Sequence, residues 1–204
     1  MKFLVLASAS PRRREMLNLF PFEVVVEVPM VAETVKPGER PAAAARRLAR
    51  EKMREVVRRR GDDAPVLAAD TVVVLGEEIL GKPRDEADAR RMLRLLSGRV
   101  HRVITGVAIR WRGKEQIFSV SSRVVFRDLS EREIADYVAS GEPSDKAGAY
   151  AVQGLGGALV SAVHGSVSNV IGLPIGEVVE ALRALGFLRG LAPAPERRAG
   201  RRRR

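Results

Sequence analysis

The chain has 204 residues, 46% of them hydrophobic and none of them cysteine, and a formal net charge of +11. This length suits one domain with a sizeable core or two small ones, and no apolar run approaches the roughly 20 residues of a membrane span. The lack of cysteine excludes disulfides, thiol catalysis and thiolate metal sites, and it favours a cytoplasmic protein.

The positive charge is concentrated at the C-terminus. Residues 189–204 contain seven arginines and one glutamate, a net charge of +6, which leaves +5 for residues 1–188. Because this last segment lacks apolar periodicity, we expect it to be a disordered tail. The sequence therefore predicts one domain over residues 1–188, and a tail whose contacts with nucleic acid would be weak and made through phosphates.

The N-terminal segment predicts a strand followed by a helix. The apolar run Phe3–Leu6 is typical of a buried strand. Ser10 is a favoured helix N-cap and Pro11 suits the first helical position, so we expect a helix from Pro11 to about Phe20.

Three arginines, Arg12, Arg13 and Arg14, occupy the first turn of this helix. The N-terminal end of a helix is already partly positive, so each cation there costs a few tenths to about 1 kcal/mol. A phosphate bound between the guanidiniums, Ser8 and the free backbone N–H groups would offset this cost. A solvated basic turn, with arginines that point apart, explains this stretch equally well.

Residues 22–28 predict a strand and residues 29–40 a loop. Glu33 in this loop either reaches a site at the end of the sheet or is simply solvated. A helix is expected over residues 41–60, with Lys52 interrupting its apolar stripe. A lysine there either snorkels from the edge of the core or directs its amine at a phosphate in a cleft.

The apolar run over residues 65–75 contains Asp70. Small residues around Asp70 suggest that the strand ends there, at a position where open α/β sheets commonly bind ligands. A carboxylate among so many apolar neighbours is costly without a partner. Metal binding or catalysis is one explanation, and a capped turn or an ion pair with a buried arginine is the other.

Residues 72–80 predict a hairpin, and a stiff connection, Gly81-Lys82-Pro83, follows it. Lys82 is thereby held as a further cation. A scaffold helix capped by Asp85 should extend to Ser97. A second hairpin of two long strands is then expected over residues 99–128.

The C-terminal third combines helices with a long loop. The capping box Ser130–Glu133 predicts a helix, which should end near Ser140. Residues 141–157 are polar and rich in glycine, as in ordered ligand loops, and Gln153 either reads a base edge with its amide or faces water. A strand over residues 158–163 and a last helix are expected to follow.

The order of these elements predicts an α/β protein with a mixed sheet. A Walker phosphate loop and a Rossmann fingerprint are absent, and His101 and His164 lack the spacing of zinc ligands. What remains is hard-cation chemistry, in which carboxylates bind Mg²⁺ or Mn²⁺ while Arg and Lys bind phosphate oxygens. This set suits hydrolysis of a phosphoryl bond.

Six segments, in order, resemble the Maf proteins, and together they span nearly everything before the tail. The segments are Leu6-Ala7-Ser8-Ala9-Ser10-Pro11-Arg12-Arg13, Ala69-Asp70-Thr71-Val72-Val73, Gly81-Lys82-Pro83, His101-Arg102-Val103-Ile104-Thr105-Gly106-Val107, Asp145-Lys146-Ala147-Gly148-Ala149-Tyr150 and Asn169-Val170-Ile171-Gly172-Leu173-Pro174.

The resemblance implies a fold related to the inosine triphosphate pyrophosphatases, with a mixed twisted sheet flanked by helices and two lobes around a cleft. It also implies a nucleoside triphosphate pyrophosphatase, which releases pyrophosphate and leaves a nucleoside monophosphate. Asp70 would be the catalytic carboxylate, acting as a base or through Mg²⁺ or Mn²⁺, and Glu33 would be a second metal ligand. The substrate-binding residues would be Ser8, Arg12, Arg13, Lys52, Lys82 and Gln153.

The combination of Lys82 and Gln153 resembles the branch that hydrolyses dTTP and UTP, with modified pyrimidine triphosphates as further substrates. The family pattern has an acidic residue before the glutamate that matches Glu33, where this chain has Ala32. Two alternatives stay open: a nucleotide-binding protein of cell division (septum formation) without turnover, and the same reaction on purine triphosphates. Monomer and homodimer also stay open.

Overall fold

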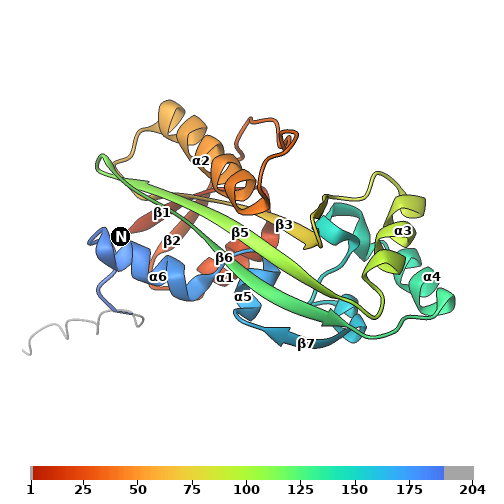
Figure 1. The fold of residues 1–204 in the computed structure, drawn as a ribbon. Helices are drawn as coiled ribbons and strands as arrows, with labels where there is room; N and C mark the ends of the chain where they lie inside the picture. Colours follow the sequence, from red (N-terminus) through yellow and green to blue (C-terminus); the bar gives the residue numbers. More distant parts are fainter. Residues whose placement is uncertain (1, 191–204) are drawn as a thin grey trace, which may run out of the picture.

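The computed structural model describes residues 2–190, which form a seven-stranded sheet with helices on both faces (Figure 1). The predicted tail beyond residue 190 lies outside the described residues. No helix within this part of the chain is both long and apolar enough to cross a membrane. The elements in chain order are β1 (Phe3–Ala7), α1 (Pro11–Leu17), β2 (Glu23–Val26), α2 (Pro41–Arg60), β3 (Val66–Leu75), β4 (Glu78–Leu80), α3 (Glu86–Leu96), β5 (Val100–Trp111), β6 (Lys114–Phe126), α4 (Glu131–Ala139), the 3₁₀ turns η1 (Glu142–Asp145), η2 (Ala147–Ala149) and η3 (Leu155–Leu159), β7 (Val160–His164), α5 (Val167–Ile171) and α6 (Ile175–Ala184).

The sheet has the strand order β2-β1-β3-β5-β6-β7, and the short β4 pairs with β3 outside this path. β1 runs parallel to both β2 and β3. The pairs β3–β5, β5–β6 and β6–β7 are antiparallel. The mixed α/β sheet predicted from the sequence is therefore confirmed, with β3 as the strand that joins its parallel and antiparallel parts.

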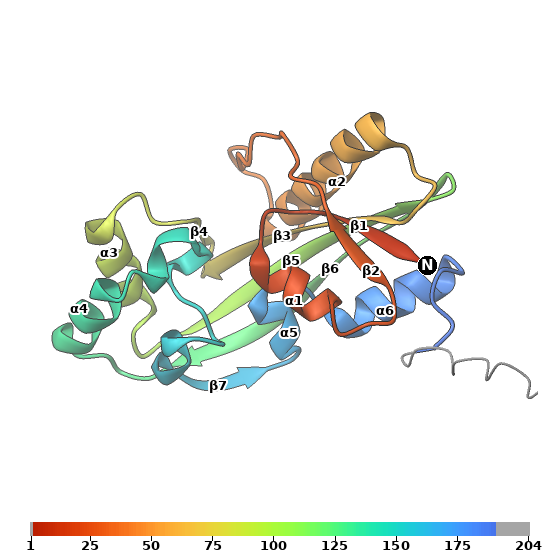
Figure 2. The ribbon, with the colours of Figure 1, turned by 180° about the vertical axis from the view of Figure 1, so that it is seen from behind.

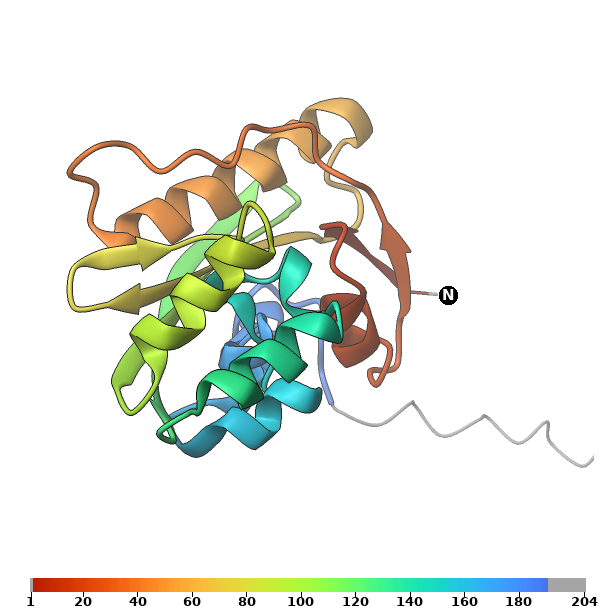
Figure 3. The same ribbon diagram turned by 90° about the vertical axis from the view of Figure 1, so that its right-hand side faces the viewer.

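Helix α2 covers one face of the sheet, and α1, α3, α4, α5 and α6 lie on the other (Figures 1 and 3). Successive side chains of a strand point to opposite faces, so a strand covered on both sides is apolar on both. In β3, Val66 and Ala68 pack in the cluster under α2, whereas Leu67 and Ala69 pack in the cluster under α6. This explains the nearly continuous apolar run that contains Asp70.

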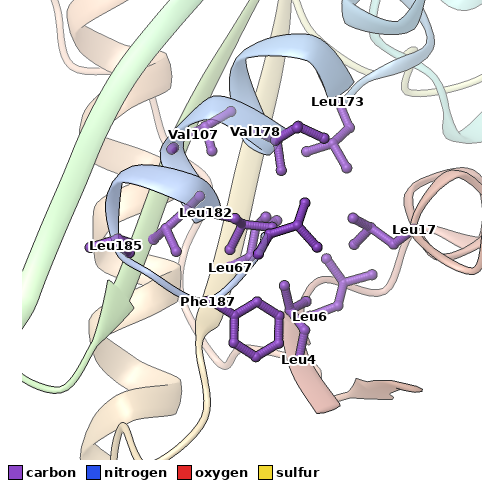
Figure 4. Packing of buried hydrophobic residues seen from close by; sticks show 14 of the residues in the cluster. Leu4, Leu6, Leu17, Leu67, Val107, Leu173, Val178, Leu182, Leu185 and Phe187 are labelled. Carbon is purple, nitrogen blue, oxygen red and sulfur yellow. The ribbon is translucent and has the colours of Figure 1, made fainter. Parts of the chain in front are cut away.

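The core under α6 joins residues from distant parts of the chain (Figure 4). Its members include Leu4, Leu6, Leu17, Leu67, Val107, Leu173, Val178, Leu182, Leu185 and Phe187. A separate cluster lies at the other end of the sheet, beneath α3 and α4. The long strands β5 and β6 connect the two ends, so the helices group into two lobes (Figure 2).

Local signals placed most helices correctly. The side chain of Asp85 accepts the N–H of Asp88 at the start of α3, and Ser130 and Glu133 form the expected capping box of α4. Helix α5 was not predicted, because its five residues are too few to show a helical period. Helix α1 ends at Leu17 rather than near Phe20.

Candidate functional site

A gap along one edge of β3 forms the centre of a cleft. β1 pairs with β3 only as far as Ala68, and β4 pairs with the same edge from Val73 onward. β5 pairs with the opposite edge along the whole of this stretch. Asp70 and Thr71 therefore lie where the sheet is open on one side, and they line a cleft of about 720 Å³.

The expectation that the strand ends near Asp70 is wrong, because β3 continues to Leu75. The continuous pairing with β5 keeps the chain extended after β1 has ended. Asp70 lies instead just beyond the carboxyl end of the parallel strand β1. Asp70 is therefore near the end of a strand as expected, but that strand is β1 and not its own strand, β3.

Asp70 and Glu33 share one ammonium group. Nζ of Lys52 donates to Oδ1 of Asp70 at 2.6 Å and lies 2.8 Å from Oε1 of Glu33. Lys52 and Asp70 are only 4% and 6% exposed, whereas the side chain of Glu33 is 48% exposed. The lysine that interrupts the apolar stripe of α2 is therefore buried between two carboxylates that point to the same part of the cleft.

A glycine allows α2 to approach the sheet closely enough for this contact. Gly106 in β5 is paired directly with Asp70 in β3. A Cβ atom at Gly106 would overlap the backbone of Ala45 and Arg46 in α2. The helix backbone thus rests on the strand beside Asp70, and Lys52 extends from the same helix to the carboxylate.

The loop that carries Glu33 is tied to α2 by an ion pair. Nε and Nη2 of Arg47 donate to the carboxylate of Glu39 at 2.8 and 2.6 Å. Nη2 of Arg47 also donates to the carbonyl oxygen of Thr34 at 2.9 Å, next to Glu33. Partial burial raises the pKa of Glu33, but the hydrogen bond and charge of Lys52, with the charge of Lys82, lower it overall below its ordinary value.

Arg13 is anchored on the other face of β3. Its Nε donates to the carbonyl oxygen of Gly172 at 2.8 Å, while Nη1 and Nη2 donate to Oγ of Ser8 and Oγ1 of Thr71, each at 3.0 Å. Burial lowers the pKa of Arg13 and the charge of Asp70 opposes this shift, and a guanidinium remains protonated in either case. Arg13 thus joins α1 to β3 and to the segment after α5.

At the start of α1, the hydroxyl that accepts a backbone N–H belongs to Ser8 and not to Ser10. Ser10 is the N-cap residue, but its hydroxyl makes no capping hydrogen bond. Oγ of Ser8 accepts the N–H of Ser10 at 3.2 Å in addition to the bond from Arg13. Arg14 is exposed. The arginines of the first turn therefore separate, and Arg12 and Arg13 line the cleft.

Asp145 at the end of η1 and the next residue, Lys146, lie across the cleft from α1. Nη1 of Arg12 lies 3.7 Å from Oδ2 of Asp145. Nζ of Lys146 contacts the carboxylate of Asp145 and donates to the carbonyl oxygen of Glu142 at 2.7 Å. Lys82 is more exposed than Lys146, and its Nζ lies 4.0 Å from Oε2 of Glu33.

All eight residues named from the sequence line this one cleft. They are Ser8, Arg12, Arg13, Glu33, Lys52, Asp70, Lys82 and Gln153, and of these Gln153 is exposed at the rim. Sequence reasoning assigned no role to three further lining residues, Thr71, Asp145 and Lys146. The polar character of the 141–157 loop was a signal for the last two, whereas Thr71 is revealed only by its contact with Arg13.

The cleft is electropositive and rich in hard oxygen donors. Its charged side chains are five cations and three carboxylates, a net charge of +2, from Arg12, Arg13, Lys52, Lys82 and Lys146 against Glu33, Asp70 and Asp145. Within residues 2–190 no group of three or more His, Asp or Glu side chains is arranged to hold a metal ion. A pair of carboxylates fits Mg²⁺ or Mn²⁺ when substrate phosphates supply further oxygens.

Comparison with known proteins gives consistent matches. The sequence profile of the family described as Maf-like protein matches residues 3–185. A Myxococcus xanthus protein named dTTP/UTP pyrophosphatase is 55% identical over 184 residues, 90% of this chain and 93% of that protein. A Thermococcus kodakarensis protein of the same name is 50% identical over 184 residues, 90% of this chain and 97% of that protein.

Solved structures show more distant likenesses. The Staphylococcus aureus Ham1 protein has a TM-score of 0.44 and 16% identity, covering 62% of this chain and 73% of that one. A nucleoside-triphosphatase (dITP/XTP pyrophosphatase) from Mycobacterium abscessus has a TM-score of 0.44 and 16% identity, covering 90% of this chain and 97% of that one.

Proposed function

The chain belongs to the Maf family, and we propose that it hydrolyses dTTP and UTP to the nucleoside monophosphate and pyrophosphate. The observation that carries this proposal is the environment of Asp70. A buried carboxylate at an open edge of the sheet is held by Lys52 inside a cleft with a net positive charge. Such a cleft attracts a polyanion and presents a base to it.

The cations of the cleft would hold the triphosphate from several sides. Arg12 and Arg13 come from α1, Lys52 from α2 and Lys82 from the connection after β4. Arg13 already donates to three protein oxygens, so its part is to fix the start of α1 and to add positive charge. Arg12 and Lys82 are the more accessible cations and would contact phosphate oxygens directly.

Asp70 is the proposed general base. It would accept a proton from a water molecule that attacks the α-phosphorus, and the bond from this phosphorus to the bridging oxygen of the pyrophosphate would break. Lys52 keeps one carboxylate oxygen of Asp70 engaged and orients the group. Positioning of this kind, together with charge neutralisation, accounts for much of the rate in phosphoryl chemistry.

Mg²⁺ or Mn²⁺ is proposed as the cofactor, because Asp70 and Glu33 offer oxygen ligands at one point of the cleft. When bound, such a cation neutralises charge on the phosphates and polarises their oxygens. Lys52 would then hold the two carboxylates together from the protein side. Ala32 is exposed beside Glu33 and offers no oxygen ligand from its side chain.

Gln153 at the rim is proposed to meet the base. Its amide both donates and accepts hydrogen bonds, as the edge of thymine or uracil requires. A site that uses such bonds discriminates strongly against a base that leaves its polar groups unpaired. Substitution of Gln153 by Ala should therefore change the preference between pyrimidine and purine triphosphates.

Pyrophosphate release from a panel of nucleoside triphosphates, with Mg²⁺ or Mn²⁺ and after chelation, tests the function. We expect dTTP and UTP to be the best substrates, and Asp70→Asn to reduce kcat by about 10²- to 10⁴-fold. Asp136→Asn, which removes an exposed carboxylate of α4, is the matched control. Nucleotide binding without release from any triphosphate would favour a binding protein instead, and an unimpaired Asp70→Asn variant would refute the role of Asp70.

A further inference from the structure

One carboxylate outside the catalytic group holds the segment that contains Gln153. Oε1 of Glu142 accepts the hydroxyl of Tyr137 at 2.7 Å and the N–H of Gly156 at 3.0 Å. Oε2 of Glu142 accepts the N–H of Leu155 at 3.0 Å. The carboxylate thus accepts three hydrogen bonds, two of them from backbone N–H groups two and three residues after Gln153.

Tyr137 extends the same contact to the residues before Gln153. Its hydroxyl oxygen accepts the N–H of Ala151 at 3.2 Å while its hydrogen is donated to Glu142. Tyr137 belongs to α4 and is only 5% exposed, so it is a fixed support. Gln153 is therefore exposed at the cleft between two tethered points of the backbone.

Two glycines adapt the segment to this support. A Cβ atom at Gly154 would overlap the carboxylate of Glu142, and a Cβ atom at Gly156 would lie 2.6 Å from the hydroxyl oxygen of Tyr137. At Gly156 a Cβ atom would also lie 2.7 Å from the carbonyl oxygen of Ala151, whereas at Gly154 it would displace the end of the Glu142 side chain. The segment 151–157 is thus shaped around Glu142 and does not merely touch it.

The charge states suit this arrangement. Burial raises the pKa of Glu142, but the hydrogen bonds from Gly156, Tyr137 and Leu155 lower it overall below its ordinary value. Burial, followed by the bond to Glu142, raises the pKa of Tyr137 well above its ordinary value. At neutral pH the carboxylate is therefore ionised and accepts, and the phenol is protonated and donates.

We propose that Glu142 is a positioning residue for base selectivity, which holds Gln153 where the base of the substrate meets it. This inference rests on the proposed function. A loop that is ordered before binding does not lose conformational freedom on binding, so its contacts contribute fully to affinity. Lys146 donates to the backbone carbonyl of Glu142 and not to its side chain, so a change of the Glu142 carboxylate leaves this bond in place.

The test compares kcat/KM for UTP, dTTP and GTP in the wild type and in Glu142→Gln. A glutamine cannot accept on both atoms, so at least one tether is lost. We expect kcat/KM for UTP and dTTP to fall about tenfold, chiefly through KM, and that for GTP to change by less than about twofold. The ratio of kcat/KM for UTP to kcat/KM for GTP should therefore fall. A simple loss of folded enzyme would instead lower all three kcat/KM values equally.

Tyr137→Phe and Gly154→Ala are second variants, and both should shift the same ratio in the same direction even if Glu142→Gln folds poorly. Asp136→Asn removes a carboxylate from the same region without contact to the segment, and it should leave the ratio unchanged. An unchanged UTP-to-GTP ratio in the folded variants would overturn the role of Glu142. Failure of the wild type to release pyrophosphate from any triphosphate would instead overturn the proposed function.

Discussion

Replacement of Lys52 by Met should destabilise the protein strongly, because it leaves the buried carboxylate of Asp70 without its hydrogen-bonded cation. Met retains most of the apolar stem of the lysine, so the packing of α2 changes little. Nζ of Lys52 lies 2.6 Å from Oδ1 of Asp70, and Asp70 is only 6% exposed. Removal of one partner from a buried ion pair costs about 3 to 5 kcal/mol. We expect a loss of this size in the free energy of unfolding.

Replacement of the other partner, Asp70, should lower the free energy of unfolding by less. In Asp70→Asn the ammonium of Lys52 keeps Glu33 at 2.8 Å, so we expect a loss of about 1 to 2 kcal/mol. The double variant has neither buried charge, and Glu33 is half-exposed and can be solvated. Its loss should be about 2 kcal/mol, well below the sum of the two single losses.

Urea unfolding of the four proteins, read as a double-mutant cycle, measures these values. Lys82→Met is the matched control. The side chain of Lys82 is 63% exposed, so its replacement should lower the free energy of unfolding by less than about 0.5 kcal/mol. Additive losses in the double variant, or a Lys52→Met variant as stable as the control, would refute the argument that the buried pair is a coupled unit.

Two further substitutions test the supports of the cleft. The hydrogen bonds of Arg47 lower the pKa of Glu39 to about 2, so the pair stabilises the fold above about pH 4.5 and loses this effect as the pH falls toward 2. Glu39→Gln should therefore lower the free energy of unfolding by about 2 kcal/mol at pH 7, measured by thermal or urea unfolding. The difference in this free energy between the variant and the wild type should vanish near pH 2. A difference that does not change with pH would contradict this prediction. Gly106→Ala should destabilise the protein by about 1 to 3 kcal/mol and reduce turnover, because the added methyl group displaces α2 at Ala45. A variant as stable and active as the wild type would show that α2 and β5 are not in tight contact at Gly106.

Local physical chemistry was enough to predict most elements. The caps at Asp85 and Ser130 act within one helical turn, and the apolar periods of α2 and α3 extend over several turns, so both can be read from neighbouring residues. The missing helix α5 and the early end of α1 are short features that tertiary contacts decide. The sequence also identified unfavourable charges, at Arg12 and Arg13 and at Asp70, that needed a partner.

The sequence by itself thus determined most of the elements, the mixed sheet and the list of residues with unsatisfied charge. Only the tertiary structure decided how these residues meet. The end of β1 beside a continuing β3 opens the gap for Asp70, and the close approach of α2 at Gly106 brings Lys52 to it. Arg13 reaches Gly172, 159 residues away in the chain. The pairing of β1 with β3 and the approach of α2 depend on contacts between distant segments, so no local pattern in the chain can specify them.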